Sequence, residues 1–142
     1  MERDVQHELF RVRGRLRTPE RLAAVLELPP EEVGKVVVFE GAEGPVVALV
    51  PSDRDPDPKR VGLAANAKDL TKVSPARASQ LSDYIPDAIP PVALPSEFRV
   101  LMDASLAERE VVYFHAGDSS AVLKLRGADL ARAAAATVAP LA

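Results

Sequence analysis

Apolar runs with a two-residue period alternate along the chain with stretches that have the wider spacing of helices. The clearest signal is a hairpin, in which residues 35–40 and 45–50 flank the turn Gly41-Ala42-Glu43-Gly44. Shorter apolar runs predict five further strands, at residues 8–13, 71–73, 98–102, 110–114 and 121–125.

Three helices are predicted to begin at a capping residue followed by proline, namely Thr18-Pro19, Asp57-Pro58 and Ser74-Pro75. Each pair supplies a side-chain acceptor at the N-cap and a preset φ at the first helical position. The expected helices cover residues 20–28, 58–67 and 75–82, a closing helix covers 129–138, and residues 30–34 form a single turn.

The segment 85–95 contains four prolines, which exclude a helix or a central strand there. Helices interspersed with hairpins indicate an α+β fold around a mixed, mostly antiparallel β-sheet. With 142 residues and neither an internal repeat nor a long linker, we expect residues 1–142 to form a single domain.

The amino-acid composition excludes several classes of reaction and binding site. The absence of cysteine excludes disulfides, thiol catalysis and iron–sulfur clusters, and two histidines without a carboxylate cluster argue against a metal site. The formal net charge of −3 argues against bulk, charge-driven binding of nucleic acid and leaves a local basic face open. No apolar run approaches the roughly 20 residues of a membrane span, and no signal peptide is evident, so we expect a cytoplasmic protein.

Lys35 opens an otherwise apolar strand and is the first candidate for function. At the mouth of a sheet its ammonium group could aim three donors at an anionic or carbonyl oxygen. The alternative, a surface lysine whose stem packs on the strand end, is the commoner arrangement.

Two further candidates follow along the chain. The proline-rich loop after Tyr84, residues 85–91, holds backbone N–H groups in place, as an oxyanion or a phosphate requires, although such loops are more often rigid crossovers. His115 ends a strand before a turn, where it is either a pocket-rim donor or base, or a partly exposed residue without a function.

Arginines at every second position would share one face if the first strand extended far enough. Such a basic stripe would suit phosphates, and the alternative is a solvated outer face. The stripe consists of Arg11, Arg13, Arg15 and Arg17.

The order of several segments carries a resemblance to a known family. These segments are 21–28, 29–39, 47–54, 76–84, 100–106, 111–117 and 128–130. The series resembles the YbaK/prolyl-tRNA synthetase-associated family of aminoacyl-tRNA editing domains over roughly residues 20–132. The resemblance implies that family's fold, a mixed sheet or barrel flanked by helices.

The resemblance also implies a reaction, hydrolysis of the ester of a mischarged amino acid on the 3′ end of tRNA. Lys35 matches the family's signature lysine, and residues 87–91 match its Gly-x-x-x-Pro loop, with Asp87 in place of the glycine. The implied catalytic residues are Lys35, Asp87 and Ala88, and the implied substrate-binding residues are Tyr84, Ile89, Pro91, His115 and Gly117. No cofactor or metal is implied.

Two hypotheses follow. The first is a deacylase that acts in trans on aminoacyl-tRNA, with a synthetase as a second partner. The second is a catalytically silent binding module for a tRNA 3′ end, a small ligand or a protein, which the carboxylate of Asp87 motivates because it would repel an ester and a phosphate. The amino-acid specificity and the oligomeric state do not follow from the sequence.

Overall fold

The computed structural model describes residues 7–12, 16 and 18–142. Its strands are β1 (His7–Arg11), β2 (Gly34–Gly41), β3 (Gly44–Pro51), β4 (Thr71–Lys72), β5 (Arg99–Asp103), β6 (Val112–His115), β7 (Ala121–Leu125) and β8 (Thr137–Ala139). Its helices are α1 (Pro19–Val25), α2 (Pro58–Ala65), α3 (Pro75–Ser82), α4 (Ala104–Ala107) and α5 (Gly127–Ala133), with 3₁₀ turns η1 (Pro30–Glu32) and η2 (Pro86–Ala88).

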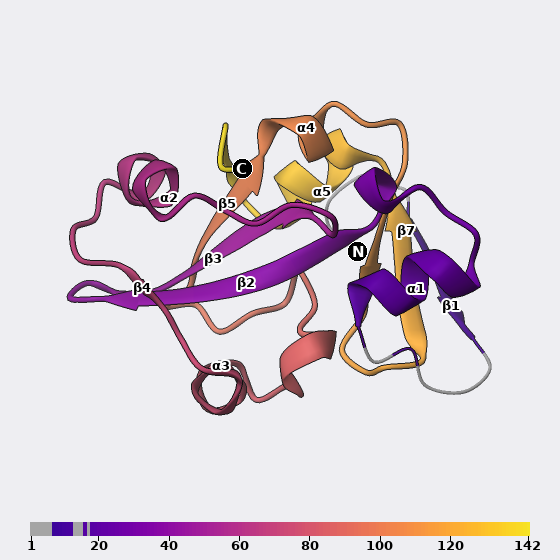
Figure 1. Ribbon diagram of the computed structural model, residues 1–142, viewed down its shortest axis with the longest axis horizontal. Coiled ribbons are helices and arrows are strands. Elements are labelled where there is room, and N and C mark those ends of the chain that lie inside the picture. Colours follow the sequence, from indigo (N-terminus) through magenta and orange to yellow (C-terminus); the bar gives the residue numbers. More distant parts are fainter. Residues whose placement is uncertain (1–6, 13–15, 17) are drawn as a thin grey trace.

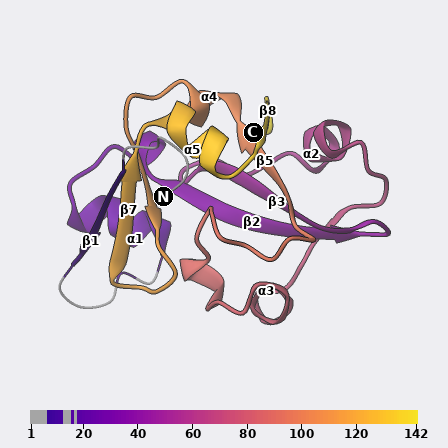
Figure 2. The ribbon, with the colours of Figure 1, turned by 180° about the vertical axis from the view of Figure 1, so that it is seen from behind.

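The strands form two sheets, one with the order β1-β7-β6 and one with the order β4-β2-β3-β5-β8. The smaller sheet is antiparallel, whereas β5 runs parallel to both β3 and β8 in the larger one. A parallel bridge between Val33 and Tyr113 joins the sheets where β2 begins. The three-stranded sheet and α1 therefore lie at one end of the long β2–β3 hairpin, and β4 lies near its other end (Figures 1 and 2).

β3 is buried on both faces because it lies in the middle of the larger sheet. Val47 and Leu49 pack with residues of α3, α4, α5 and the smaller sheet, whereas Val46, Ala48 and Val50 pack under α2. A third apolar cluster lies under α1 and includes Leu22, Val33 and Val122. The α+β class with a mixed sheet is confirmed.

The three predicted caps are confirmed. The side chains of Thr18, Asp57 and Ser74 accept hydrogen bonds from the backbone N–H groups of Arg21, Lys59 and Arg77, respectively. In each case proline occupies the first helical position, so the cap chemistry fixes where the helix begins.

The structure corrects the sequence prediction at three places. The closing helix ends at Ala133 instead of 138, because Ala135 takes a positive φ of 51° and residues 137–139 pair with β5. The short helix α4 was not predicted, although Asp103 caps it. The proline segment 85–95, expected to contain no helix, holds the single 3₁₀ turn η2 with proline at its first position.

Candidate active site

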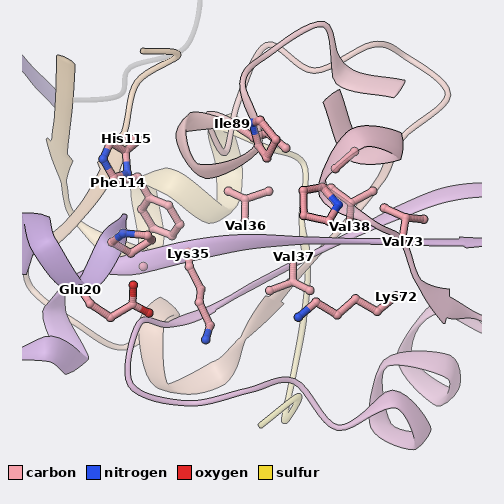
Figure 3. A pocket seen from close by; sticks show the side chains of 15 residues that line it. Glu20, Lys35, Val36, Val37, Val38, Lys72, Val73, Ile89, Phe114 and His115 are labelled. Carbon is pink, nitrogen blue, oxygen red and sulfur yellow. The ribbon is translucent and has the colours of Figure 1, made fainter. Parts of the chain in front are cut away.

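A cavity of about 270 Å³ opens along the edge of β2 that faces away from β3. Its lining includes the start of α1, all of residues 34–38, the end of β4 and the start of α3. The end of β6 and two residues of the proline segment, Pro86 and Ile89, complete it. The cavity thus collects segments that are far apart in the sequence (Figure 3).

Lys35 lines this cavity, and its side chain is only 18% exposed. Its Nζ donates to Oδ1 of Asp55 at 2.9 Å, and the Asp55 side chain, on the loop after β3, is 88% exposed. The hydrogen bond and the charge of Lys35 lower the pKa of the Asp55 carboxyl, with a smaller contribution from Lys72. The ammonium group of Lys35 is therefore held at the cavity by a carboxylate that is itself open to solvent.

The charged groups of the cavity lie on one side of β2. Figure 3 shows the side chains of Lys35 and Lys72 on the same side of the strand, with Glu20 of α1 nearby. Two ammonium groups next to solvent-exposed carboxylates can bind an anionic group of a ligand if that group displaces the carboxylates.

The other side of β2 is mainly apolar, with His115 as its polar residue (Figure 3). Val36 points from the strand toward Ile89, and Phe114 stands beside them (Figure 3). The Phe114 ring lies against the backbone of Gly34, where a Cβ atom would be 2.0 Å from Cζ of the ring. Glycine at position 34 is thus required by close approach, and it lets Phe114 close the end of the cavity.

His115 lines the cavity but is buried, with 3% of its surface exposed. The expectation of a partly exposed residue is therefore wrong. Its Nε2 lies 2.5 Å from the carbonyl oxygen of Leu16. Because a carbonyl only accepts, Nε2 must carry a proton and donate it in this bond.

The predicted loop residues divide into two groups. Ile89 reaches the cavity, whereas Tyr84, Ala88, Pro91 and Gly117 are not part of its lining. For Asp87 the structure describes the backbone, and its side chain lies outside the described part.

The loop residues outside the lining hold the loop in position through backbone hydrogen bonds and a ring contact. The N–H of Ala88 donates to the carbonyl of Ile85, and the carbonyl of Ala88 accepts from the N–H of Gly117 at 3.1 Å. Gly117 has a φ of +105° and lies against the Tyr84 ring. The carbonyl of Ala88 therefore ties the loop to the turn after β6, and its N–H closes the 3₁₀ turn within the loop.

The arginine stripe is seen only at Arg11, because positions 13, 15 and 17 lie outside the described residues. Arg11 donates to Asp118 at 3.0 Å and to Ser120 at 3.1 Å, on the turn between β6 and β7. Hydrogen bonds from the backbone and side chain of Ser120, followed by that from Arg11, lower the pKa of Asp118 to about 2. Arg11 thus stabilises a turn in this structure.

Sequence reasoning assigned no site role to three charged residues, Glu20, Asp55 and Lys72, and considered Lys72 only as part of a looser basic region. Lys72 ends the two-residue strand β4 and pairs with Phe39 of β2. A lysine next to a short strand carries no signal by itself, and only the pairing of β4 with β2 brings it to Lys35. For Asp55 the alternating acidic loop 53–57 was a visible feature, but its partner is distant in the sequence.

The family model of the aminoacyl-tRNA editing domain matches residues 14–133. The chain belongs to this family. Membership supports a role in aminoacyl-tRNA editing and, in general, an interaction with tRNA or a synthetase. No curated protein matches the chain.

Solved structures share the fold of this editing domain. The hypothetical protein APE2540 superposes with a TM-score of 0.89 at 24% identity, covering 96% of this chain and 91% of that one. A proposed trans-editing enzyme for prolyl-tRNA synthetase superposes with a TM-score of 0.84 at 20% identity, covering 95% of this chain and 85% of that one. At these identities the likeness extends to the fold alone.

Two further properties concern the described residues of the editing domain. None of the helices there is long and apolar enough to cross a membrane. Likewise, the described part of the chain holds no group of three or more His, Asp or Glu side chains arranged to bind a metal ion.

Proposed function

We propose that this editing domain is a deacylase that acts in trans and hydrolyses the ester of a mischarged amino acid on tRNA. The observation that carries the proposal is the meeting of Lys35 with Ile89, Phe114 and His115 around one cavity. A cationic group beside an apolar pocket suits a substrate whose amino-acid side chain is neutral and whose nucleotide is anionic. We also propose that residues 1–142 form one domain and that a synthetase is a partner in trans.

The reaction needs no nucleophile from the protein. The oxygen of a water molecule adds to the ester carbonyl carbon, the bond from that carbon to the ribose oxygen breaks, and the ribose oxygen takes up a proton. The products are the free amino acid and the tRNA with its hydroxyl restored. In this scheme Lys35 holds the terminal nucleotide or stabilises the developing oxyanion, so catalysis is electrostatic and positional.

The proline segment has fewer free donors than its length suggests. Pro90 and Pro91 have no N–H, and the N–H of Ala88 is bonded to Ile85. Within residues 87–91 the donors left for a substrate are therefore those of Asp87 and Ile89. Ile89 lines the cavity and is the better placed of the two, and His115 forms the rear of the amino-acid pocket in this proposal.

The test is a deacylation screen against a panel of correctly and wrongly charged tRNAs, with Lys35→Ala and Lys68→Ala compared. Lys68 lies in a separate groove beside α2, so it controls for loss of a surface charge. We expect Lys35→Ala to lose about 100-fold or more in kcat/KM, as removal of one oxyanion-stabilising donor typically does, while the protein stays folded. Wild-type activity in Lys35→Ala would refute the assignment.

The ion pair between Lys35 and Asp55 favours a second candidate, a binding module without turnover, since it neutralises the lysine that the reaction needs. Such a module would bind charged tRNA in the same screen, and the ester would survive. Binding without hydrolysis across the whole panel would therefore select the second candidate over the first.

A further inference from the structure

The edge of β2 that faces away from β3 is paired at two points with a gap between them. At one end Val33 bridges to Tyr113 of the smaller sheet. At the other end Phe39 pairs with Lys72, and the N–H of Val73 donates to the carbonyl of Val38 at 3.1 Å. Within the described residues, no strand pairs with this edge between positions 34 and 37.

The strand period identifies which backbone groups face the gap. In an antiparallel ladder the N–H and C=O of one residue point the same way, and successive residues alternate. Because the carbonyl of Val38 points to the β4 side, both backbone groups of Val36 face the gap. The carbonyl of Val33 accepts from Ser52 N at 2.7 Å on the β3 side, which agrees with this alternation.

The gap coincides with the cavity, whose lining includes every residue from 34 to 38. Figure 3 shows that Val36 and Ile89 lie on one side of β2, and Lys35 and Lys72 on the other. The backbone of Val36 thus presents one donor and one acceptor along the line where the apolar and charged sides of the cavity meet.

An aminoacyl ester matches this pair of groups. Its α-amino nitrogen and its carbonyl oxygen flank one Cα atom, as the N–H and C=O of a strand residue do. In an antiparallel sheet, two residues of this kind exchange both hydrogen bonds. The amine would donate to the Val36 carbonyl, and the acyl carbonyl would accept from the Val36 N–H.

The geometry points to the backbone of Val36 as the element that recognises the aminoacyl group. The aminoacyl group pairs with Val36 as a single residue of a neighbouring antiparallel strand would. This inference rests on the proposed deacylase function and deepens it. The amino-acid side chain then enters the apolar side near Ile89, and the ribose and its phosphate lie toward Lys35 and Lys72. As water adds, the Val36 N–H remains bonded to the oxygen that becomes negative.

The first experiment removes the donor. Val36→Pro deletes the N–H at an edge position where no ladder bond is lost, the kind of site at which a strand tolerates proline. Val36→Ala is the matched control, since it trims the side chain and keeps both backbone groups. We expect kcat/KM of Val36→Pro to lie about 100-fold below that of Val36→Ala, as for loss of one oxyanion donor. Equal values in two folded variants would overturn the inference.

The second experiment leaves the protein unchanged, so it holds even if Val36→Pro does not fold. Wild-type protein is given tRNA charged with an amino acid and the same tRNA carrying the des-amino acyl ester. Each rate is divided by its spontaneous rate, because the amine also activates the ester in water. We expect an enhancement about tenfold smaller for the des-amino ester, the loss expected for a hydrogen bond to a charged amine.

The outcomes separate this inference from the proposed function. If the wild-type protein cleaves charged tRNA and enhances both esters equally, the Val36 inference is wrong and the deacylase assignment stands. If it cleaves no charged tRNA in the panel, both are wrong.

Discussion

Replacement of Asp55 by asparagine tests whether the carboxylate beside Lys35 competes with the substrate or positions the lysine. The pair is close, with 2.9 Å between Nζ and Oδ1, but the Asp55 side chain is 88% exposed. A pair this open to solvent contributes about 0.2–1 kcal/mol. We therefore expect Asp55→Asn to lower the free energy of unfolding by less than about 1 kcal/mol.

The same figure bounds the effect on substrate. A phosphate or carbonyl that binds Lys35 must first displace the carboxylate of Asp55. In Asp55→Asn this cost is absent, so the free energy of substrate binding should become more favourable by up to about 1 kcal/mol. Since about 1.4 kcal/mol corresponds to a factor of ten, KM should fall by up to about fivefold, with kcat unchanged. The gain should shrink as salt is added, because exposed charges are screened.

Steady-state deacylation at low and high salt measures this effect, with Asp53→Asn in the same loop as the control. Because the pKa of Asp55 is lowered, its carboxylate stays ionised until the pH falls below its ordinary value of about 3.9, and only there should the wild-type protein approach the variant. A rise in KM or a fall in kcat for Asp55→Asn would refute the competition and show that Asp55 positions Lys35.

Two further predictions concern stability. Burial raises the pKa of Asp103, but hydrogen bonds, including those from the N–H groups of Leu141 at 2.7 Å and Ala142 at 3.1 Å, lower it overall. In urea denaturation, Asp103→Asn should lower the free energy of unfolding by about 1.5–3 kcal/mol at pH 7. The loss should be smaller in acid, where the wild-type carboxylate is protonated, and an equal loss at both pH values would contradict this. Gly34→Ala should cost about 1–3 kcal/mol in thermal unfolding because Phe114 must move, and unchanged stability would argue against that packing.

Much of the fold could be predicted because its signals are local. The capping bonds of Thr18, Asp57 and Ser74 span two or three residues, so sequence alone places the helix starts. β8 could not be predicted in this way. Residues 131–136 include a run of alanines, which favours helix, but pairing with β5 some 35 residues earlier decides the conformation of Thr137 and Val138.

The candidate site likewise has one residue with a local sequence signal and others that only long-range contacts bring together. Lys35 was identified because a charge in an apolar strand is anomalous without knowledge of any partner. Asp55 and Lys72 become part of the site only through the path of the loop after β3 and the pairing of β4 with β2. The gap at Val36 has no sequence signal, since it consists of backbone groups that the neighbouring strands fail to cover.

The charges around the cavity indicate how a chain with a net charge of −3 would accept the tRNA of the proposed function. On the charged side, Lys35 and Lys72 face Asp55 and Glu20, so their formal charges cancel. Attraction then comes from exchange of a carboxylate for a phosphate, not from a surplus of positive charge. With about 0.7 counterions released per phosphate contact on a single strand, two lysines give a shallow salt dependence. Under the proposed function, selectivity would therefore come from the uncharged parts of the cavity, its apolar side and the backbone of Val36.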